Sequence, residues 1–465
     1  MRVSPAAVAI VALAAAFAAV IVGSQLINPS RPLVVSAGFD QSAITPNADG
    51  DADVTNFAFE LSRPAVLSLL LSDASGQAYS IRRDMRTPAG AYSLAFSGVV
   101  DGFLLPDEEL ESTVERRLIP NGDYMWQFVA QEIGGPESYS DSGTFSVSNA
   151  DAELPLLNGF TVSPEVFTPN QDGIADRVAV NANLEKDAEV IGYLIGPDGA
   201  RIYMERRESE IPSGEEGWQE FDYEGGVDIG VDPPPDGTYE VVIEAQDTVG
   251  QRVSVSGELT IELGGKPRAG ILGQSSGADV VFATAPYDEA YFSDRDGLGE
   301  LIPMPNNPAD NRLGQVVVPI GDLLIFKLLV ENVGSSPIRT DGPPPGIVYN
   351  QDQLPAALGE LEQDGVWRVG IECETSQTSY PYRWAVGAFD DLTQVEDPVS
   401  GNTYYYLEPG QRSVVWGAVR LTEAISAANP QQCWAGLIHE GVTVVNQRIG
   451  ARDIKIEEIT GADLE

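Results

Sequence analysis

Histidine, cysteine and basic side chains are scarce in this sequence, and each shortage narrows the chemistry available to it. The 465 residues include one histidine, His439, and two cysteines. Histidine is the usual general base near neutral pH, and a catalytic zinc site usually needs two or three histidine or cysteine ligands. No P-loop or G-x-G-x-x-G fingerprint is present either. Residue counts do not exclude an enzyme that uses two catalytic carboxylates. The scarcity of histidine and cysteine and the absence of nucleotide-binding motifs favour a protein that is not an enzyme.

Basic residues number 27 against 70 acidic ones, which gives a formal net charge of −43. Such a charge argues against nucleic acid as a partner, because phosphate binding needs a basic surface. It argues equally against docking on an anionic membrane face. It suits divalent cations, or a crowded exterior in which self-repulsion keeps proteins apart. Hydrophobic residues still make up 43%, enough for packed cores, and the length allows about three domains.

Long apolar runs are absent except at the N-terminus. Residues 6–23 contain no charged side chain, and a helix of that length would span about 27 Å, close to the thickness of a bilayer core. The run predicts either a signal peptide or an uncleaved membrane anchor at residues 1–24, followed by a linker at 25–35. In both cases the body is extracytoplasmic, on the cell surface or secreted. It touches a membrane only through this segment, if the segment is retained.

The two cysteines, Cys373 and Cys433, both lie in the last third of the chain. An even pair in one exported domain favours a disulfide, and closing a loop of this length would stabilise the fold by about 4 kcal/mol. The alternative is two separate buried thiols, which behave as small apolar residues.

Two stretches of the chain repeat. The sequence T-P-N-x-D-G-x-x-D occurs at residues 45–53 and again at 168–176, and a second shared piece, P-[ND]-G-x-Y, follows at 120–124 and 235–239. Between them, apolar residues alternate with polar ones and are interrupted by Gly, Pro and Asp turns, which predicts short antiparallel strands. Self-similarity at this spacing predicts two copies of one β-sandwich domain.

This order of motifs resembles the Ig-like domain of the flagellar hook-capping protein, a domain type appended to many secreted bacterial proteins. The resemblance covers residues 36–149 and 157–263, and it implies all-β spacers or assembly modules rather than catalysts. The first copy departs from the pattern through an acidic insertion at residues 107–117, which leaves the length of its last loop open.

The last third of the chain differs from the repeats. A Gly/Pro-rich stretch opens it, and we interpret residues 264–286 as a linker. Residues 323–337, a strand followed by Asn-x-Gly-Ser, and 407–416, which contain Leu-x-Pro-Gly, resemble strands of the adhesion-type Ig-like modules of prokaryotic surface proteins. We therefore expect a third, larger sandwich at residues 287–460. The whole is predicted to be all-β, with three tandem Ig-like antiparallel β-sandwiches behind an N-terminal hydrophobic helix.

The acidic loops of the two repeats are candidate Ca²⁺ sites. Aligned on their glycine, alternate residues offer oxygens at the ligand positions of an EF-type loop; the side-chain candidates are Thr45, Asn47, Asp49, Asp51 and Asp53 in the first loop and Thr168, Asn170, Asp172 and Asp176 in the second. Threonine replaces the usual aspartate at the first position, and the usual bidentate glutamate is missing from the last. The alternative is a capped turn, in which Asn and Asp side chains accept hydrogen bonds from nearby backbone amides.

Four of the six tryptophans lie in the last third, and exposed aromatic rings on such modules often bind sugars. The candidate binding residues are Trp367, Trp384, Trp416 and Trp434. Their alternation with other apolar residues along predicted strands favours core positions instead, and the same pattern places His439 at a core edge.

Together these features favour an exported, non-enzymatic cell-surface or secreted protein with a structural or adhesive role. The first two domains would act as a spacer. The third would bind a cell-envelope or extracellular protein or polysaccharide. The alternative is a carbohydrate-binding or periplasmic accessory module for a separate enzyme, which an exposed row of aromatic rings would favour.

Overall fold

The computed structural model describes residues 31–208, 211–274, 277–287, 302–305, 314–353, 361–397 and 401–458. The segment 1–24, predicted to be a signal peptide or anchor, lies outside these residues. Within them, no helix has both the length and the apolar character needed to cross a membrane. The described chain is all-β, with two short 3-10 helices, η3 (Phe389–Asp391) and η4 (Ser426–Ala428).

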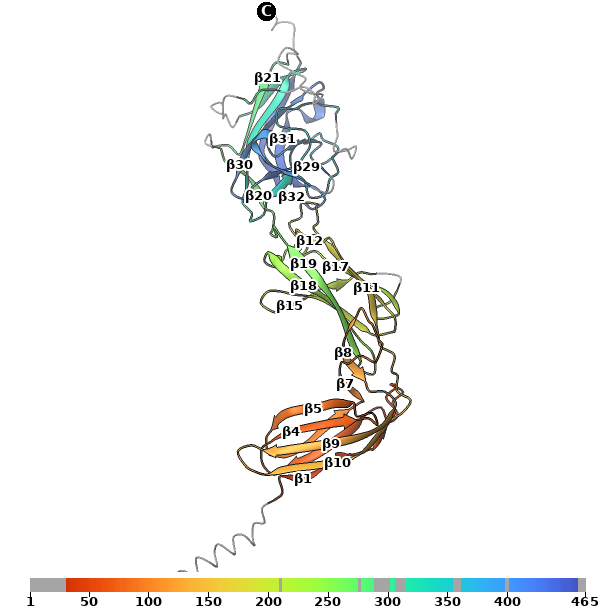
Figure 1. Ribbon diagram of the computed structural model, residues 1–465. Coiled ribbons are helices and arrows are strands. Elements are labelled where there is room, and N and C mark those ends of the chain that lie inside the picture. Colours follow the sequence, from red (N-terminus) through yellow and green to blue (C-terminus); the bar gives the residue numbers. More distant parts are fainter. Residues whose placement is uncertain are drawn as a thin grey trace, which may run out of the picture.

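Six sheets pair off around three large hydrophobic clusters, and these clusters define three units along the chain (Figure 1). In the first unit a three-stranded sheet faces a five-stranded one. The first sheet contains β1 (Val34–Phe39), β3 (Thr55–Leu61) and β6 (Gly90–Phe96), and the second contains β2 (Ala43–Ile44), β10 (Ser138–Val147), β9 (Gly122–Glu132), β4 (Ala65–Ser72) and β5 (Ala78–Thr87). Every second residue of β3 and β4 is buried, because successive side chains point to opposite faces of a strand.

The second unit repeats this plan. One sheet contains β11 (Leu157–Ser163), β13 (Val178–Leu184), β17 (Gly217–Tyr223) and β16 (Glu205–Arg206). The facing sheet contains β15 (Arg201–Tyr203), β14 (Glu189–Ile195), β18 (Gly237–Gln246) and β19 (Arg252–Ile261), with β12 (Val166–Phe167) beside β19. Two strands from the first repeat, β8 (Thr113–Leu118) and β7 (Val99–Asp101), extend this second sheet beyond β19.

The third unit is the largest. One sheet contains β20 (Ala269–Leu272), β23 (Leu323–Asn332), β30 (Arg412–Arg420) and β25 (Val348–Asn350), with β21 (Val280–Ala285) beside β23. The other contains β22 (Val316–Pro319), β32 (Thr443–Glu457), β31 (Gln431–His439), β26 (Trp367–Cys373), β24 (Ile338–Thr340), β29 (Thr403–Leu407) and β28 (Thr393–Glu396), with β27 (Tyr382–Ala385) beside β26. Cys373 and Cys433 lie directly opposite each other on β26 and β31 and form a disulfide.

Two boundaries predicted from the sequence are wrong. Residues 264–286 are not simply a linker, because β20 and β21 both pair with β23 and carry core residues such as Val280 and Phe282. The first unit also begins before residue 36, since Leu33 and Val34 are buried in its core. In both places a short run of apolar residues adds a strand to a sheet whose partner strand comes later in the sequence. The neighbouring residues alone therefore do not reveal the pairing.

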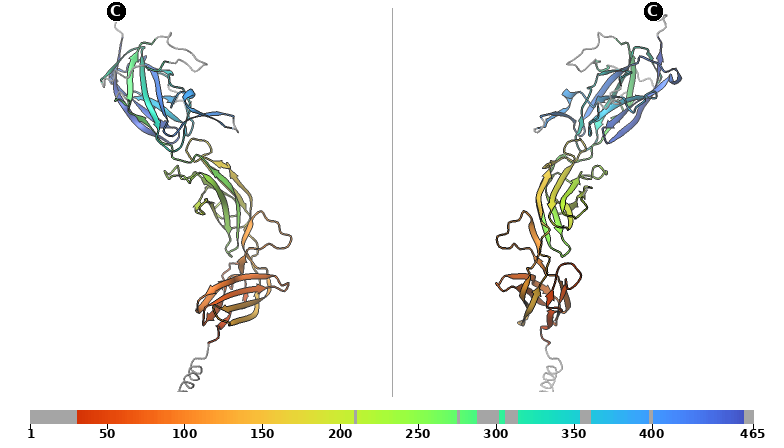
Figure 2. Two further views of the ribbon diagram at one scale, coloured as in Figure 1. Left: turned by 60° about the vertical axis from the view of Figure 1, so that its left-hand side comes forward. Right: turned by 90° about the vertical axis from the view of Figure 1, so that its right-hand side faces the viewer.

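The three units follow one another end to end, with the C-terminus at the end farthest from the first unit (Figure 1). The same extended arrangement is visible from two further sides in Figure 2. What fixes the angle between neighbouring units is therefore the chemistry of the two junctions.

Candidate functional site

The first junction is built by the acidic insertion of the first repeat. β8 pairs antiparallel with β19, with Val114 opposite Val253, so this segment adds a strand to the sheet of the second unit. Ser112 fixes its start, because its hydroxyl donates to the carbonyl of Leu157 at 2.6 Å and accepts from the Leu157 amide at 2.9 Å. The insertion, which sequence comparison of the repeats left as a loop of uncertain length, is thus the connection between two units.

A fully buried glutamine completes this junction. The Oε1 of Gln251 accepts a hydrogen bond from the backbone amide of Leu118 at 3.2 Å. Its Nε2 donates to the carbonyls of Asp151 and Glu153 at 3.1 and 2.7 Å. Lys186 adds ion pairs to Asp151 and Asp247 at 2.9 and 2.8 Å. A buried polar group is costly unless paired, so these contacts hold the two units in one relative position.

The two T-P-N-x-D-G loops have the same internal hydrogen bonds. In the first, Asp53 accepts from the amides of Asn47, Ala48 and Gly50 at 2.9, 3.0 and 2.8 Å. In the second, Asp176 accepts from the amides of Asn170 and Gly173 in the same way. Both are capped turns, and in each loop the last carboxylate is directed at backbone N–H groups.

This bonding bears on the candidate Ca²⁺ ligands. The Asn47 and Asp49 side chains accept hydrogen bonds from amides two residues on, and Thr45 donates its hydroxyl proton to the Asp51 carbonyl. Within the described residues, no group of three or more His, Cys, Asp or Glu side chains is placed to hold a metal ion. The geometry favours the turn over the metal site.

We expect thermal melts of the full chain in 1 mM Ca²⁺ and in excess chelator to superimpose, because the side chains of Asn47, Asp49 and Asp53 already accept hydrogen bonds from backbone amides. A native-state ligand at a hundredfold excess over its dissociation constant stabilises by about 2.7 kcal/mol, which such melts resolve easily. Separation of the two curves would restore the calcium interpretation of the loops.

The second loop differs from the first in what covers it. Its Asn170 and Asp172 are 2% and 5% exposed, whereas Asp49 of the first loop lies in solvent. The covering surface belongs to the third unit. The hydroxyl of Tyr406 donates to Oδ2 of Asp172 at 3.0 Å, and Nε2 of His439 lies 2.7 Å from the carbonyl oxygen of Gln171. We call the loop at residues 168–176 the plug.

The side chains of Tyr406, His439 and Arg339 surround the plug, and we call them its socket. His439 stacks on Trp367 with 4.4 Å between ring centroids, and since its Nε2 faces a carbonyl oxygen, this nitrogen is the donor. Arg339 donates to the carbonyl of Asp364 at 2.8 Å, which orders the segment that meets the plug. Two glycines touch here: a Cβ on Gly173 would lie 2.2 Å from the Asp364 carbonyl oxygen, and one on Gly365 would lie 2.1 Å from the backbone of Asp172.

Burial shifts the pKa of several groups where the plug meets its socket, and it raises the pKa of Asp176 in the plug. It raises the pKa of Asp172 to about 6, and the neighbouring Asp176 carboxylate raises it further, against the opposing effects of Tyr406 and Arg339. Burial also lowers the pKa of His439 to about 4, and the positive charge of Arg339 acts in the same direction. Docking the plug therefore favours a neutral form of each group.

The pKa shifts of Asp172 and His439 have opposite consequences for docking below neutral pH. The Asp172 contribution is present below its ordinary pKa of 3.8 and is lost as pH rises through 6, whereas the His439 contribution is present above 6.5 and is lost as pH falls through 4. We expect the intact junction to change little between pH 4 and 6.5. Asp172→Asn should weaken docking as pH falls through this range, and His439→Gln should strengthen it.

The measurement is the distance between labels in the second and third units across this pH range. Equal pH responses of the two variants would contradict the assignment. Asp49→Asn, at the equivalent position of the exposed first loop, is the matched control and should not affect the distance at any pH.

The candidate tryptophans do not form a platform in the described part of the chain. Trp367, Trp384 and Trp434 are 1%, 0% and 5% exposed, and the indole N–H groups of Trp384 and Trp416 donate to the carbonyls of Ile347 and Ile302. Burial removes Trp367, Trp384 and Trp434 from the candidate binding residues, because alternation along β26 and β27 turns the first two rings into the main core and Trp434 packs against Tyr380 and Ile438. Trp416 is half-buried beside Leu323 and Ala418.

One sequence of the form G-x-S-x-G, at residues 273–277, raises the question of a serine nucleophile; its two serines lie outside the described residues. It connects β20 and β21, which pair with consecutive stretches of β23. A nucleophile elbow joins a strand to a helix instead. The single histidine that could serve as its base is the one buried against the plug.

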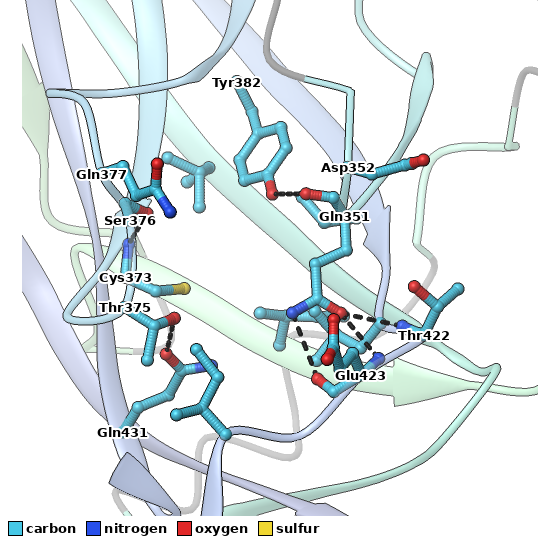
Figure 3. Close-up of a pocket in the computed structure, with 15 residues that line it drawn as sticks. Gln351, Asp352, Cys373, Thr375, Ser376, Gln377, Tyr382, Thr422, Glu423 and Gln431 are labelled. Atoms are coloured by element: carbon cyan, nitrogen blue, oxygen red, sulfur yellow. Dashed lines mark hydrogen bonds between the residues drawn. The ribbon is translucent and has the colours of Figure 1, made fainter. Parts of the chain in front are cut away.

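The third unit contains a pocket of about 210 Å³, and Figure 3 shows the side chains that line it. Cys373 ends β26 and Gln431 begins β31, so the pocket lies at the opposite end of these strands from the socket, where Trp367 and His439 pair. Its lining combines the buried apolar residues Leu324 and Ile371 with polar side chains from three loops. No repeat or motif in the sequence marks these loop residues.

The candidate sites are therefore two interlocked junctions and one distal pocket. No protein-family model matches the chain, and no curated protein matches it.

Proposed function

We propose that this chain is an exported, non-enzymatic structural protein in which three tandem Ig-like sandwiches form a stiff spacer with its interaction surface at the distal end. The observation that carries this proposal is the construction of both junctions. One is a shared sheet closed by the buried Gln251, and the other is a plug seated in a socket. Tandem units joined by a flexible linker would need neither.

The proposed role also agrees with the charge of the chain. A net charge of −43 favours an extended, soluble arrangement through self-repulsion. We assign the interaction surface to the distal pocket because three of the four tryptophans that the sequence offered for this role are buried. The alternative function, a carbohydrate-binding accessory module, depended on an exposed row of aromatic rings. The burial of three of these four tryptophans removes that support.

Labelling of intact source cells tests this proposal. One epitope is inserted in the turn between β4 and β5 of the first unit, and another follows residue 458. We expect antibodies to label both without permeabilisation, with the second epitope farther from the envelope by immunogold. Labelling that requires permeabilisation would contradict an exported spacer, and equal heights of the two epitopes would contradict an upright one.

A further inference from the structure

The distal pocket has an apolar floor and an acidic rim. Leu324, Ile371, Val419 and Leu421 are all buried beneath it. Above them stand Asp352 and Glu423, both exposed, and neither carboxylate forms an ion pair with any residue in the described ranges. The combination matches a group that has an apolar stem and a positive end.

The rim is held in place by Gln351. Its Oε1 accepts from the amides of Thr422 and Glu423, both at 2.9 Å, and its Nε2 donates to the Glu423 carbonyl at 3.1 Å. The hydroxyl of Tyr382 in turn donates to the Gln351 carbonyl at 2.7 Å, as Figure 3 shows. The loop that carries Glu423 is thus preorganised, which reduces the entropy lost when a ligand binds.

A buried amide on the opposite wall faces the same space. Gln431 is 4% exposed, and its Oε1 accepts a hydrogen bond from the Thr375 hydroxyl at 2.5 Å. Its Nε2 makes no hydrogen bond to another described residue, although this residue lines the pocket. This Nε2 is not among the fully buried unpaired side-chain atoms of the described residues, so solvent reaches it in the pocket, where a peptide carbonyl is a suitable acceptor.

We propose that this pocket binds a basic side chain, lysine or arginine, presented by an extended segment of a partner protein. The aliphatic stem lies on the apolar floor, the cationic end meets Asp352 and Glu423, and a backbone carbonyl of the partner accepts from Gln431. A volume of about 210 Å³ equals roughly seven waters at about 30 Å³ each, which suits one long side chain rather than a folded loop. The overall negative charge attracts such a segment from a distance.

This inference rests on the proposed role of the third unit as the interaction end, but its test does not depend on the stiffness of the chain. The probe is N-acetyl-lysine methylamide, titrated into the full chain and followed by ligand-observed NMR. The norleucine analogue has a stem of similar length without the charge, and the glutamate analogue reverses the charge. We expect the lysine probe to bind more tightly than either, and raising the salt from 20 to 300 mM to weaken it.

Charge-removing variants locate the site. Asp352→Asn and Glu423→Gln should each weaken binding of the lysine probe by about two- to fivefold, the range for a partly exposed ion pair, and together by about tenfold. Glu396→Gln on β28, an exposed carboxylate outside the pocket, is the matched control and should bind like the parent chain. Unchanged thermal melts show that the variants are folded.

Two outcomes would overturn the proposal. The first is equal binding of the lysine and norleucine probes to the parent chain, a comparison that needs no variant. The second is binding of the lysine probe that the pocket variants and Glu396→Gln change to the same extent, since that would reflect general attraction to an acidic protein.

Discussion

Gly173→Ala is expected to release the third unit from the second while both remain folded. Gly173 has a φ of +81°, and an added Cβ would lie 2.2 Å from the carbonyl oxygen of Asp364, so the plug could no longer seat. Two side-chain hydrogen bonds across the junction, from Tyr406 and His439, would be lost with it, each worth about 1 kcal/mol.

The chain offers a matched control for this substitution. Gly50 occupies the equivalent position in the first loop with a φ of +88°, and an added Cβ there meets nothing within 4 Å. Gly50→Ala therefore introduces the same backbone strain, about 1 kcal/mol, without any clash. The difference between the two variants isolates the docking of the plug.

Distances between spin labels provide the measurement. Tyr203 in the second unit and Val395 in the third are 61% and 46% exposed, and both can be replaced by cysteine, since the native cysteines are paired. The parent chain and Gly50→Ala should give one narrow distance, and Gly173→Ala a broad distribution. A narrow, unchanged distance in Gly173→Ala would mean that the plug does not set the angle.

Removal of the Cys373–Cys433 disulfide is expected to destabilise the third unit by about 4 kcal/mol, the cost for a closed loop of 60 residues in the chain-entropy model. That loop includes β27 to β30, so the loss of the bond frees strands of both sheets. The Cys373→Ala/Cys433→Ala double variant should melt earlier than the parent chain when followed by tryptophan fluorescence, which reports mainly on this unit.

Melting of the first two units is the internal control, because the disulfide does not touch them. Their transition, followed by circular dichroism at temperatures where the third unit has already unfolded, should stay where it is in the parent chain. Identical tryptophan melts before and after reduction of the parent chain would contradict a stabilising role for the bond.

The sequence predicted best what depends on local pattern. Alternation such as Phe57-Ala58-Phe59 specifies which face of a strand is buried, and it placed several of the long strands and the inward rings of Trp367 and Trp384. The pairing of Cys373 with Cys433 was predicted from the expected export of the chain and from the even number of cysteines. Both inferences need only neighbouring residues or a count.

What the sequence did not predict depends on distant partners. The acidic insertion shows little strand pattern, and β8 forms because β19 offers it a free edge. The plug and the first loop are nearly identical in sequence, yet Asp172 is buried and Asp49 is exposed, because only the plug has a socket opposite it. The pocket residues come from separate loops, and no spacing rule connects Gln351 with Gln431.

The central claim is that the three units form one stiff body, and single-molecule energy transfer between its ends tests this most directly. Met125 in the first unit and Val395 in the third are 60% and 46% exposed, and dyes attached to cysteines at these positions report the distance across both junctions. We predict one narrow, low-efficiency peak that stays unchanged from pH 7 to pH 5 and from 50 to 500 mM salt. A broad or fluctuating efficiency in the parent chain would contradict the claim, because it would show that the units move independently.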